Sequence, residues 1–586
     1  MKSSISFFLF QTYWKAITCL PLFLLGSLCL VTCKKEFLET TPLGQLDANQ
    51  LATKRGVEGL LIGAYSLLDG IGGNKSDIGS AASNWIYGSI CGSEAHIGSY
   101  QGDGPTSWEQ FTSTSQSAEL ASKWGTVYDG IQRANDVLRI LTRANDIHPT
   151  DMARMAGEAR FLRAHYHFEA KKIWNQIPFI DETITYGSGN YRVSNDQDAW
   201  PSIVSDLKYA VEHLNVESYQ GAKGRANKYT AMSLLAKVFM FRHQYIEAKI
   251  YLDSIIQSGK YHLAGFHDNF NAETKNGPES IFSAQMSVND GADGLNGNLG
   301  DLFNFPGTGT GPGGCCGFFQ PTQFLVNHFK TDPVTGLPDL DHFNETDIKF
   351  DSALLSGDPF IPYTGTVDPR LDWTVGRRGI PYLDWGNHPG MDWIRDQHFG
   401  GPYSPKKNIY YKRQQDQYTD AGFWGPVTTA INVNLIRYAD VLLWAAEAEI
   451  ETGHLDKARA FINQLRHRAA DPAGWVKNPD GSPAANYKIS EYSMVWTDPE
   501  FARKAVRFER MLELALEGHR FFDLVRWGMA DQEINSYLLK EKKLRSYLNG
   551  VIFKKGCNEY FPIPQTQIDL SAGADGLRKL KQNPCY

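Results

Sequence analysis

Two stretches of the chain repeat one arrangement, an apolar helix, a short turn and a second helix that packs back on the first. In the first stretch, the apolar residues of 231–241 are followed by those of 245–252. In the second stretch, residues 441–450 are followed by 455–462, with Gly453 in the turn. The spacing of three and four residues between apolar positions is that of one helical face. Because one helix pair cannot bury its apolar face alone, the pattern predicts a stack of several pairs.

Small residues stand where the paired helices would cross, which is the pattern of a degenerate tetratricopeptide repeat. Further stripes of helical spacing run through residues 124–141 and 155–173. The last helical block, residues 502–527, is predicted to bury His519 with the apolar residues of one helical face. Its charged residues are predicted to pair at i,i+3, as Arg510–Glu513, Glu517–Arg520 and Asp523–Arg526. The chain is therefore expected to be mainly α.

Three segments between the helical blocks have a different composition, rich in glycine and aromatic residues. They are residues 66–114, 285–320 and 367–427. Insertions this long in a compact protein are usually functional, and helices resume after each one. We therefore expect loops that fold on one face of a helical scaffold, where binding residues tend to gather.

The N-terminus has the features of a lipoprotein export signal. Lys2 and Lys15 supply positive charge, an apolar segment follows, and residues 30–33 (LVTC) fit a lipobox. Residues 1–32 are therefore predicted to be removed and Cys33 to carry the lipid that anchors the protein to a membrane. Loss of these two lysines changes the formal charge of the chain from −7 to −9. No basic run or stripe appears, which argues against nucleic acid as a partner.

The cysteines beyond Cys33 lack zinc-finger spacing, so a structural metal finger is not expected. Cys315 and Cys316 are adjacent, which leaves three interpretations open: a vicinal disulfide, two free buried thiols, or separate bridges to other cysteines. A vicinal disulfide among the surrounding glycines would offer a rigid apolar surface to a ligand. Residues 289–294 (NDGADG) weakly suggest structural calcium, but they lack the EF-hand spacing and its final glutamate.

Seven motifs resemble the RagB/SusD lipoproteins of Bacteroidetes. They run in order along the mature chain: CKKEFLETTP (33–42), EARFLRA (158–164), DPRLD (368–372), IRYADVLL (436–443), ERMLELALEGHRFFDLVRW (509–527), FPIPQ (561–565) and LKQNP (580–584). The resemblance implies one domain over residues 33–586, with an α-rich scaffold of about four tetratricopeptide-like helix pairs. The scaffold would lie mainly in residues 42–285 and 430–586, and a loop-rich ligand-binding part mainly in residues 286–429.

The resemblance also implies a function. Members of this family are non-enzymatic nutrient binders on the extracellular face of the outer membrane, and each acts as the lid of a SusC-like TonB-dependent transporter. Most characterised relatives bind glycans and a minority bind peptides. An oligosaccharide or polysaccharide is therefore the expected ligand; peptide capture is the alternative, and surface adhesion comes third. No catalytic residue and no cofactor is expected, and the sequence itself shows no G-x-S-x-G, HExxH or Walker motif and no singled-out carboxylate pair.

A sugar-binding surface needs flat apolar faces for pyranose rings and polar groups beside them for the hydroxyls. Residues of the three loop segments supply both, and Arg395 is among the polar neighbours in the third. The candidate ligand contacts are Trp85, Tyr87, Glu94, His96, Tyr100, Asn298, Asp301, Phe303, Cys315, Cys316, Phe318, Trp385 and Trp393. The alternative for any single aromatic residue is that it anchors its own loop to the scaffold.

Overall fold

The computed structural model describes residues 47–72, 78–98, 106–307, 310–421 and 427–586. The predicted leader, the lipid-bearing Cys33 and the candidate contact Tyr100 lie outside these residues. Helix makes up 44% of the chain and strand 7%, which confirms the mainly α prediction. Within the described ranges, no helix has both the length and the apolar character needed to cross a bilayer.

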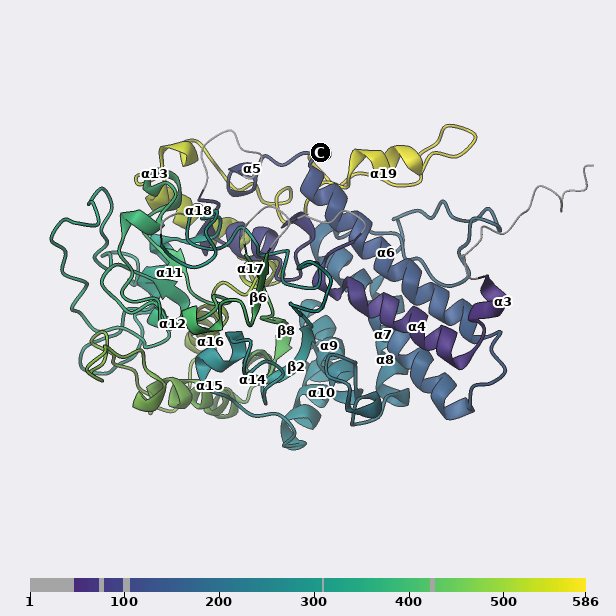
Figure 1. The fold of residues 1–586 in the computed structure, drawn as a ribbon, viewed down its shortest axis with the longest axis horizontal. Helices are drawn as coiled ribbons and strands as arrows, with labels where there is room; N and C mark the ends of the chain where they lie inside the picture. The colour runs from purple at the N-terminus through teal and green to yellow at the C-terminus, as the bar shows by residue number, and fades with distance from the viewer. Residues whose placement is uncertain (1–46, 73–77, 99–105, 308–309, 422–426) are drawn as a thin grey trace, which may run out of the picture.

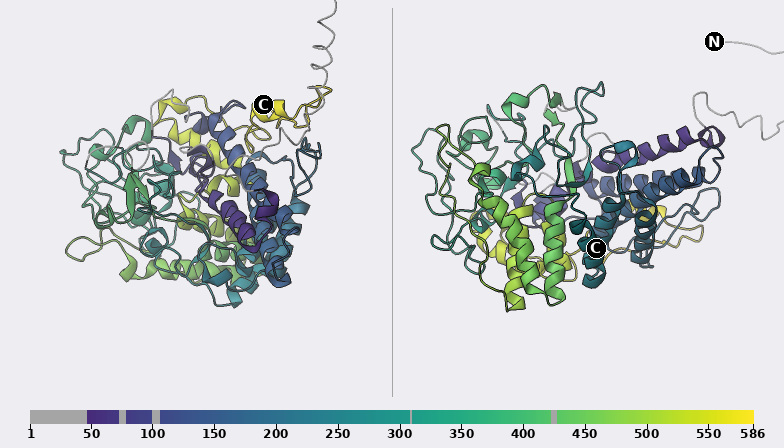
Figure 2. Two further views of the ribbon diagram at one scale, coloured as in Figure 1. Left: turned by 45° about the vertical axis from the view of Figure 1, so that its right-hand side comes forward. Right: turned by 90° about the horizontal axis from the view of Figure 1, so that it is seen from below.

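Nine longer helices form the scaffold that the structure describes, and each packs on neighbours in a continuous series (Figure 1). They are α4 (Lys54–Tyr65), α6 (Ala118–Leu141), α7 (Pro149–Trp174), α8 (Trp200–His213), α9 (Lys228–Phe241), α10 (Tyr245–Gln257), α14 (Tyr438–Glu451), α15 (Leu455–Ala470) and α16 (Pro499–Leu514). Helix α10 contacts α14, so the two halves of the scaffold join across the long loop-rich excursion between them. Seen from below, α14, α15 and α16 stand side by side (Figure 2).

The two predicted helix pairs are confirmed as α9–α10 and α14–α15. Gly453 adopts a φ of 84° between α14 and α15, a left-handed conformation that glycine takes without steric penalty. The side chain of Asn227 caps α9 by accepting a hydrogen bond from the Thr230 backbone N–H. The stripes predicted in residues 124–141 and 155–173 lie on α6 and α7.

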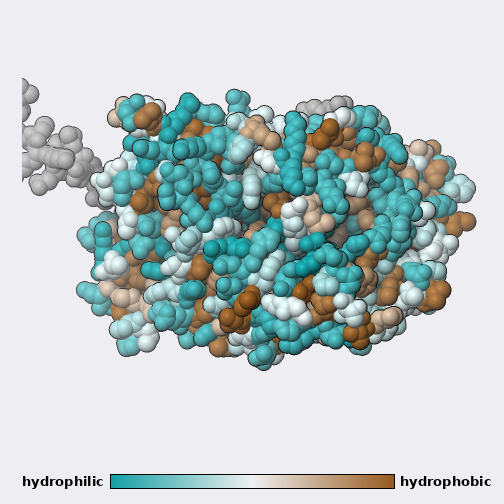
Figure 3. Space-filling view, turned by 180° about the vertical axis from the view of Figure 1, so that it is seen from behind, coloured by the Kyte–Doolittle hydropathy of each residue, from teal (hydrophilic) through white to brown (hydrophobic). Residues whose placement is uncertain are grey.

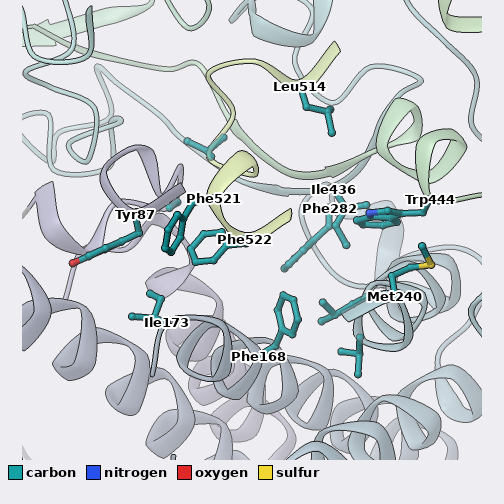
Figure 4. Close-up of a cluster of buried hydrophobic side chains, with 14 of the residues drawn as sticks. Tyr87, Phe168, Ile173, Met240, Phe282, Ile436, Trp444, Leu514, Phe521 and Phe522 are labelled. Carbon is teal, nitrogen blue, oxygen red and sulfur yellow. The ribbon is translucent and has the colours of Figure 1, made fainter. Parts of the chain in front are cut away.

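The core lies where α7, α9 and α14 meet the shorter helices of the C-terminal part. Figure 4 shows Phe168 and Ile173 from α7 facing Phe521 and Phe522, with Trp444 and Met240 packed farther along. Helix α7 is buried along almost its whole length from Arg154 onward, so it is a central helix rather than a surface helix.

The structure corrects the prediction of one helix over residues 502–527. Helix α16 ends at Leu514, and α17 (Arg520–Arg526) begins only after a turn in which Leu516 and Gly518 have φ values of 63° and 75°. A Cβ on Gly518 would overlap the carbonyl oxygen of Ser83, so the turn is the place where the scaffold meets the loop segment around Ser83.

The predicted i,i+3 ion pairs of this block are also corrected, because the charged residues reach other elements. Only Asp523–Arg526 forms as predicted, at 2.8 Å. Glu513 instead bonds three guanidinium groups, those of the buried Arg370 and Arg437 and of the partly buried Arg468. The break after Leu514 leaves Glu517 in the turn and Arg520 at the start of α17, so these two residues no longer share a helical face. Arg510 and Glu513 both lie on α16, but each pairs with partners on other elements.

The strands are short and occur as four antiparallel pairs in the described ranges, and they tie distant segments together. The pairs are β1 (Ala95–His96) with β3 (Gln320–Pro321), β2 (Ser280–Ala284) with β8 (Val433–Arg437), β4 (Val375–Gly376) with β5 (Ser404–Pro405), and β6 (Thr419–Ala421) with β7 (Val427–Thr429). The β2–β8 pair, which aligns Ser280 with Arg437, closes the base of the loop-rich excursion. The β1–β3 pair joins the first loop segment to the end of the second.

The remaining α-helices of the described ranges lie outside this series, and all but α18, which like α4 has 12 residues, are shorter. They are α3 (Ala48–Leu51), α5 (Thr106–Glu109), α11 (Gln323–His328), α12 (Leu371–Thr374), α13 (Gln397–Gly400), α18 (Ala530–Glu541) and α19 (Gln565–Leu570). The face opposite that of Figure 1 is mostly hydrophilic, with hydrophobic residues scattered over it rather than gathered in one patch (Figure 3). The division into scaffold and loop-rich part at residues 286 and 429 stays a prediction.

Candidate ligand-binding surface

The second loop segment folds back on itself around a disulfide between Cys315 and Cys316. Of the three interpretations left open by the sequence, the vicinal disulfide is the one that forms. The backbone N–H groups of Cys316 and Phe318 both donate to the Phe303 carbonyl, at 3.3 and 2.9 Å. The backbone N–H of Gly317 donates to the Phe305 carbonyl at 2.9 Å. A second disulfide joins Cys557 to Cys585, and Cys91 is buried and free.

Two phenylalanine rings lie beside this disulfide and remain partly exposed. The ring centroids of Phe303 and Phe318 are 5.5 Å apart with 59° between their planes. Both cysteines are partly exposed as well, and the neighbouring Gly314 is exposed with open space around its Cα. The structure therefore brings together four of the candidate contacts, Phe303, Cys315, Cys316 and Phe318, on one accessible patch.

Arg395 completes this patch from the third loop segment. Its guanidinium carbon lies 5.3 Å from the centre of the Phe318 ring, and its Nη1 donates to the Cys316 carbonyl at 3.3 Å. A guanidinium over an aromatic face is held there by cation–π attraction. We call Phe303, Cys315, Cys316, Phe318 and Arg395 the disulfide platform.

Trp85 lies behind the platform rather than on it, which corrects its assignment as a ligand contact. The side chain is 1% exposed, its Nε1 donates to the Gly300 carbonyl at 3.0 Å, and its ring packs edge-on against Phe319 at 5.7 Å. A ring with so little exposed surface has no face to offer a sugar. Trp85 therefore anchors the loop, which is the alternative that the sequence left open.

Tyr87 is likewise a core residue, and its assignment as a ligand contact is corrected. It is 1% exposed and packs edge-on against Trp108 and Phe561, each with ring centroids 5.3 Å away. Figure 4 shows it at the edge of the aromatic core, beside Phe521. Trp85 and Tyr87 belong to a buried six-residue helical turn, Trp85–Ile90, which carries the apolar faces inward.

Glu94 and His96 are also interior residues, at 1% and 0% exposure, so they are unavailable to a ligand at the surface. His96 bonds Glu109 at 2.9 Å and Glu541 at 3.1 Å. Burial alone would lower the pKa of His96, but the two carboxylates outweigh it and the net pKa is raised. Burial raises the pKa of Glu94 to about 8. These groups tie β1 to α5 and α18 and so position the strand next to the platform.

Asn298 and Asp301 lie beside Trp85 and bond to each other. The Asn298 amide donates to Asp301 at 2.8 Å, and the Ser83 hydroxyl donates to the same carboxylate at 2.5 Å. The cavity that both residues line, with Trp85, measures about 20 Å³, which is room for one water molecule. Burial raises the pKa of Asp301. The pair therefore braces the loop from below and leaves no space for a sugar.

The third predicted cluster forms a small core of its own. Trp393 is 3% exposed and packs edge-on against Tyr382, so it too is corrected from a ligand contact to a packing residue. Trp385 is only partly buried, and its Nε1 donates to the Tyr410 carbonyl at 3.0 Å. Trp393 supports the platform through its carbonyl, which accepts from Gly307 N–H at 2.9 Å.

Sequence reasoning missed one open pocket with a volume of about 290 Å³. Amide side chains from two distant segments line it: Asn269, Asn271, Asn276, Asn432 and Asn434. Several of them bond one another, as Asn432 bonds Asn276 at 3.2 Å. The signal in the sequence is the run of asparagines on both sides of the loop-rich excursion, which only the β2–β8 pairing brings together.

Within the described ranges, no group of three or more His, Cys, Asp or Glu side chains is placed to hold a metal ion. In the segment that weakly suggested calcium, Asp290 accepts hydrogen bonds from the Asn296 amide at 2.8 Å and from the Ser287 hydroxyl. Calcium binding stays a prediction.

A stack of helix pairs that carries a loop-borne aromatic surface defines a class, the helical-repeat binding proteins. Comparison with protein families gives the particular family. Residues 278–586 match the SusD family, and residues 60–240 match a family described as starch-binding and associating with the outer membrane. The chain belongs to the SusD family.

Individual relatives agree with this assignment. A SusD-like protein of Bacteroides ovatus is 22% identical over 583 residues, which are 93% of this chain and 92% of that protein. A SusD superfamily protein of Bacteroides vulgatus shares the fold, with a TM-score of 0.66, 20% identity and coverage of 91% and 99% of the two chains. Surface glycan-binding protein A of Bacteroides thetaiotaomicron, solved with laminarihexaose, also shares the fold. Its TM-score is 0.63 at 18% identity, and the match covers 91% of this chain and 99% of that chain.

Proposed function

We propose that this protein is a cell-surface glycan-binding protein and that the disulfide platform contacts the sugar. The observation that supports this most directly is the platform itself, two partly exposed phenylalanine rings and a disulfide beside the Arg395 guanidinium. Relatives with the same fold include a laminarin-binding SusD-like protein and a glycan-binding protein solved with laminarihexaose.

The chemistry of the platform suits a pyranose ring. The C–H faces of a sugar pack on flat apolar groups, and rigid aromatic rings provide these with little loss of rotamer entropy. Hydroxyl groups need donors and acceptors, which the exposed backbone around Gly314 provides. Binding of hydroxyls largely exchanges water for protein, so each sugar unit adds little free energy and affinity per site is modest.

We further propose that the protein is the lid of a SusC-like TonB-dependent transporter on the outer membrane. The lipid on Cys33 would tether it to the extracellular face, and closure of the lid would hold the glycan between the two proteins. The match to a family described as associating with the outer membrane supports this location. The proposed role is capture and delivery rather than catalysis, and the description of relatives with the same fold as surface glycan-binding proteins supports the capture.

A binding screen tests the ligand class. The mature protein is titrated by calorimetry with plant, host and microbial polysaccharides, their oligosaccharides and a set of short peptides, and the glycans are then analysed for cleavage. We expect heat of binding with one glycan class and intact glycan afterward. Binding to peptides alone would contradict the proposal, and shortened glycan products would contradict the non-enzymatic role.

Co-purification tests the lid. The lipidated protein is purified from outer membranes together with its partners, and a Cys33→Ala variant, which cannot be lipidated, serves as the control. We expect a TonB-dependent transporter to co-purify with the lipidated form. Recovery of the lipidated protein from the outer membrane without any transporter would contradict the lid role.

A further inference from the structure

A small polar cavity lies in the interior where α7 and α9 meet the turn between α16 and α17. It measures about 20 Å³, enough for one water-sized particle. Part of its lining is apolar, and Figure 4 shows Phe168 of α7 pointing toward Phe282 and Ile436 across this region. The remaining lining is charged or polar, and it includes His165, His519, Glu169, Lys172 and Lys237.

The lysines around this cavity share too few carboxylates. Lys123, Lys172 and Lys237 are 4%, 8% and 7% exposed. Glu169 bonds Lys172 at 2.6 Å and lies 3.6 Å from Lys123, and the described part of the chain gives these two lysines no other ion pair. In the part of the chain that the structure describes, the Lys237 ammonium donates one hydrogen bond, to the Leu435 carbonyl at 3.5 Å. Glu169 is thus the one carboxylate paired with Lys123 and Lys172 in the described ranges, where Lys237 has no ion pair.

The neighbouring ion-pair networks balance the charge of Lys237 but not that of the other two lysines. One network near Lys237 has two guanidinium groups and three carboxylates: Arg510, Arg526, Asp440, Asp523 and Glu447. Its net charge of −1 balances Lys237. A second network reaches the cavity through Glu517 and has five groups of each sign: Arg370, Lys407, Arg437, Arg466, Arg468, Asp368, Glu279, Glu509, Glu513 and Glu517. Lys123, Lys172 and Glu169 then leave a net charge of +1.

The two histidines cannot remove this charge, but they can help to hold an anion. Burial lowers the pKa of His165 and of His519 to about 4 in each case, so both are neutral at pH 7. A neutral imidazole has one N–H donor. An uncompensated charge in the interior is strongly destabilising, whereas a paired one is tolerated.

We propose that the cavity binds one monovalent anion of halide size, chloride in the simplest case, between Lys172 and Lys237. The small volume excludes carboxylates, phosphate and sulfate. One bound halide makes the interior neutral. Because Ser83 and Asn84 also line the cavity, the anion would help to join the scaffold to the segment that carries Trp85 and braces the platform.

Unfolding in two salts tests the proposal. The thermal unfolding temperature of the mature protein is compared in sodium chloride and sodium gluconate at equal ionic strength, since gluconate is too large for the cavity. For the wild type we expect a saturable rise with chloride. Lys172→Met removes the excess charge, so this variant should lose the chloride dependence and should not be less stable than the wild type in gluconate.

Lys208→Met is the matched control, because Lys208 is an exposed lysine on α8 and should leave the chloride effect unchanged. Crystals of the wild-type protein grown in sodium bromide give a second readout that needs no variant. We expect an anomalous peak within hydrogen-bonding distance of Lys172 Nζ. Equal unfolding temperatures of the wild type in both salts, or a cavity that contains only water in the bromide data, would overturn the proposal.

Discussion

Gly518 shows how one residue controls the contact between the scaffold and the first loop segment. It lies in the turn between α16 and α17 with a φ of 75°, and its backbone N–H donates to the Ser89 hydroxyl at 3.1 Å. On the other side, a Cβ on Gly88 would overlap the Gly518 carbonyl. Two glycines therefore allow the turn and the Trp85–Ile90 segment to approach more closely than larger residues would.

We expect Gly518→Ala to lower the free energy of unfolding by about 3 kcal/mol, because it combines left-handed strain with a steric overlap against Ser83. Urea denaturation followed by circular dichroism measures this change. Gly528→Ala is the matched control, since Gly528 has a φ of 67° and open space around its Cα. It should lower stability by only about 1 kcal/mol. Equal effects of the two substitutions would show that the close contact contributes nothing.

Glu94 gives a prediction about pH. Burial raises its pKa from 4.5 to about 8, so between these values the folded chain keeps a proton on Glu94 that the unfolded chain has lost. The free energy of unfolding should therefore fall as the pH rises from about 5 to 8. Glu94→Gln, which imitates the protonated form, should flatten this dependence. Denaturation series at several pH values measure it, and an unchanged slope in the variant would refute the role of Glu94.

At the scale of elements, α16 is held by a cluster of buried charges rather than by pairs along its own surface. Glu513 is 0% exposed and bonds Arg370, Arg437 and Arg468 at 3.0, 2.8 and 2.5 Å. These arginines come from three other parts of the chain. One carboxylate thus joins α16 to α15, to β8 and to the loop before α12.

We expect Glu513→Gln to lower the free energy of unfolding by about 3–5 kcal/mol, because it leaves three buried or partly buried guanidinium groups with one carboxylate fewer. Denaturant titration of the purified variant measures the loss. Glu500→Gln on the same helix is the control: its side chain is 80% exposed and pairs with Arg503, so little change is expected. An unchanged free energy of unfolding in Glu513→Gln would mean that the charge cluster does not hold the helix.

The helices show what sequence patterns can and cannot predict. The stripes in residues 124–141 and 155–173 appear as α6 and α7, because apolar periodicity is a local property of a helix. The break after Leu514 was missed, since the close approach to Ser83 is a long-range contact that periodicity does not record. The predicted Arg510–Glu513 pair failed for the same reason: both side chains find partners on distant elements.

At the scale of the molecule, the motifs that run through the mature chain predicted the family and the mainly α fold correctly. They did not separate loop residues that face solvent from those that face the core. Trp85 and Phe318 lie in similar glycine-rich surroundings, yet Trp85 is 1% exposed and Phe318 is partly exposed. Burial of a loop residue depends on which distant segment packs over it, and a single sequence does not contain that information.

Loop residues that look alike in the sequence have different roles in the molecule. Trp85, Asn298 and Asp301 brace the second loop segment from behind, and Trp393 does so from the side. The disulfide platform is the part that remains accessible. Substitution of a bracing residue should therefore lower stability and binding together, whereas substitution on the platform should lower binding alone.

Calorimetric titration of Phe318→Ala with the best glycan from the binding screen tests the central claim most directly. Loss of the ring removes a stacking face worth about 1–2 kcal/mol, so the dissociation constant should rise about tenfold. The thermal unfolding temperature should stay close to that of the wild type. Tyr186→Ala, which removes a ring that is 84% exposed elsewhere on the surface, should bind as the wild type does. A Phe318→Ala variant that is folded and binds the glycan with unchanged affinity would contradict the account.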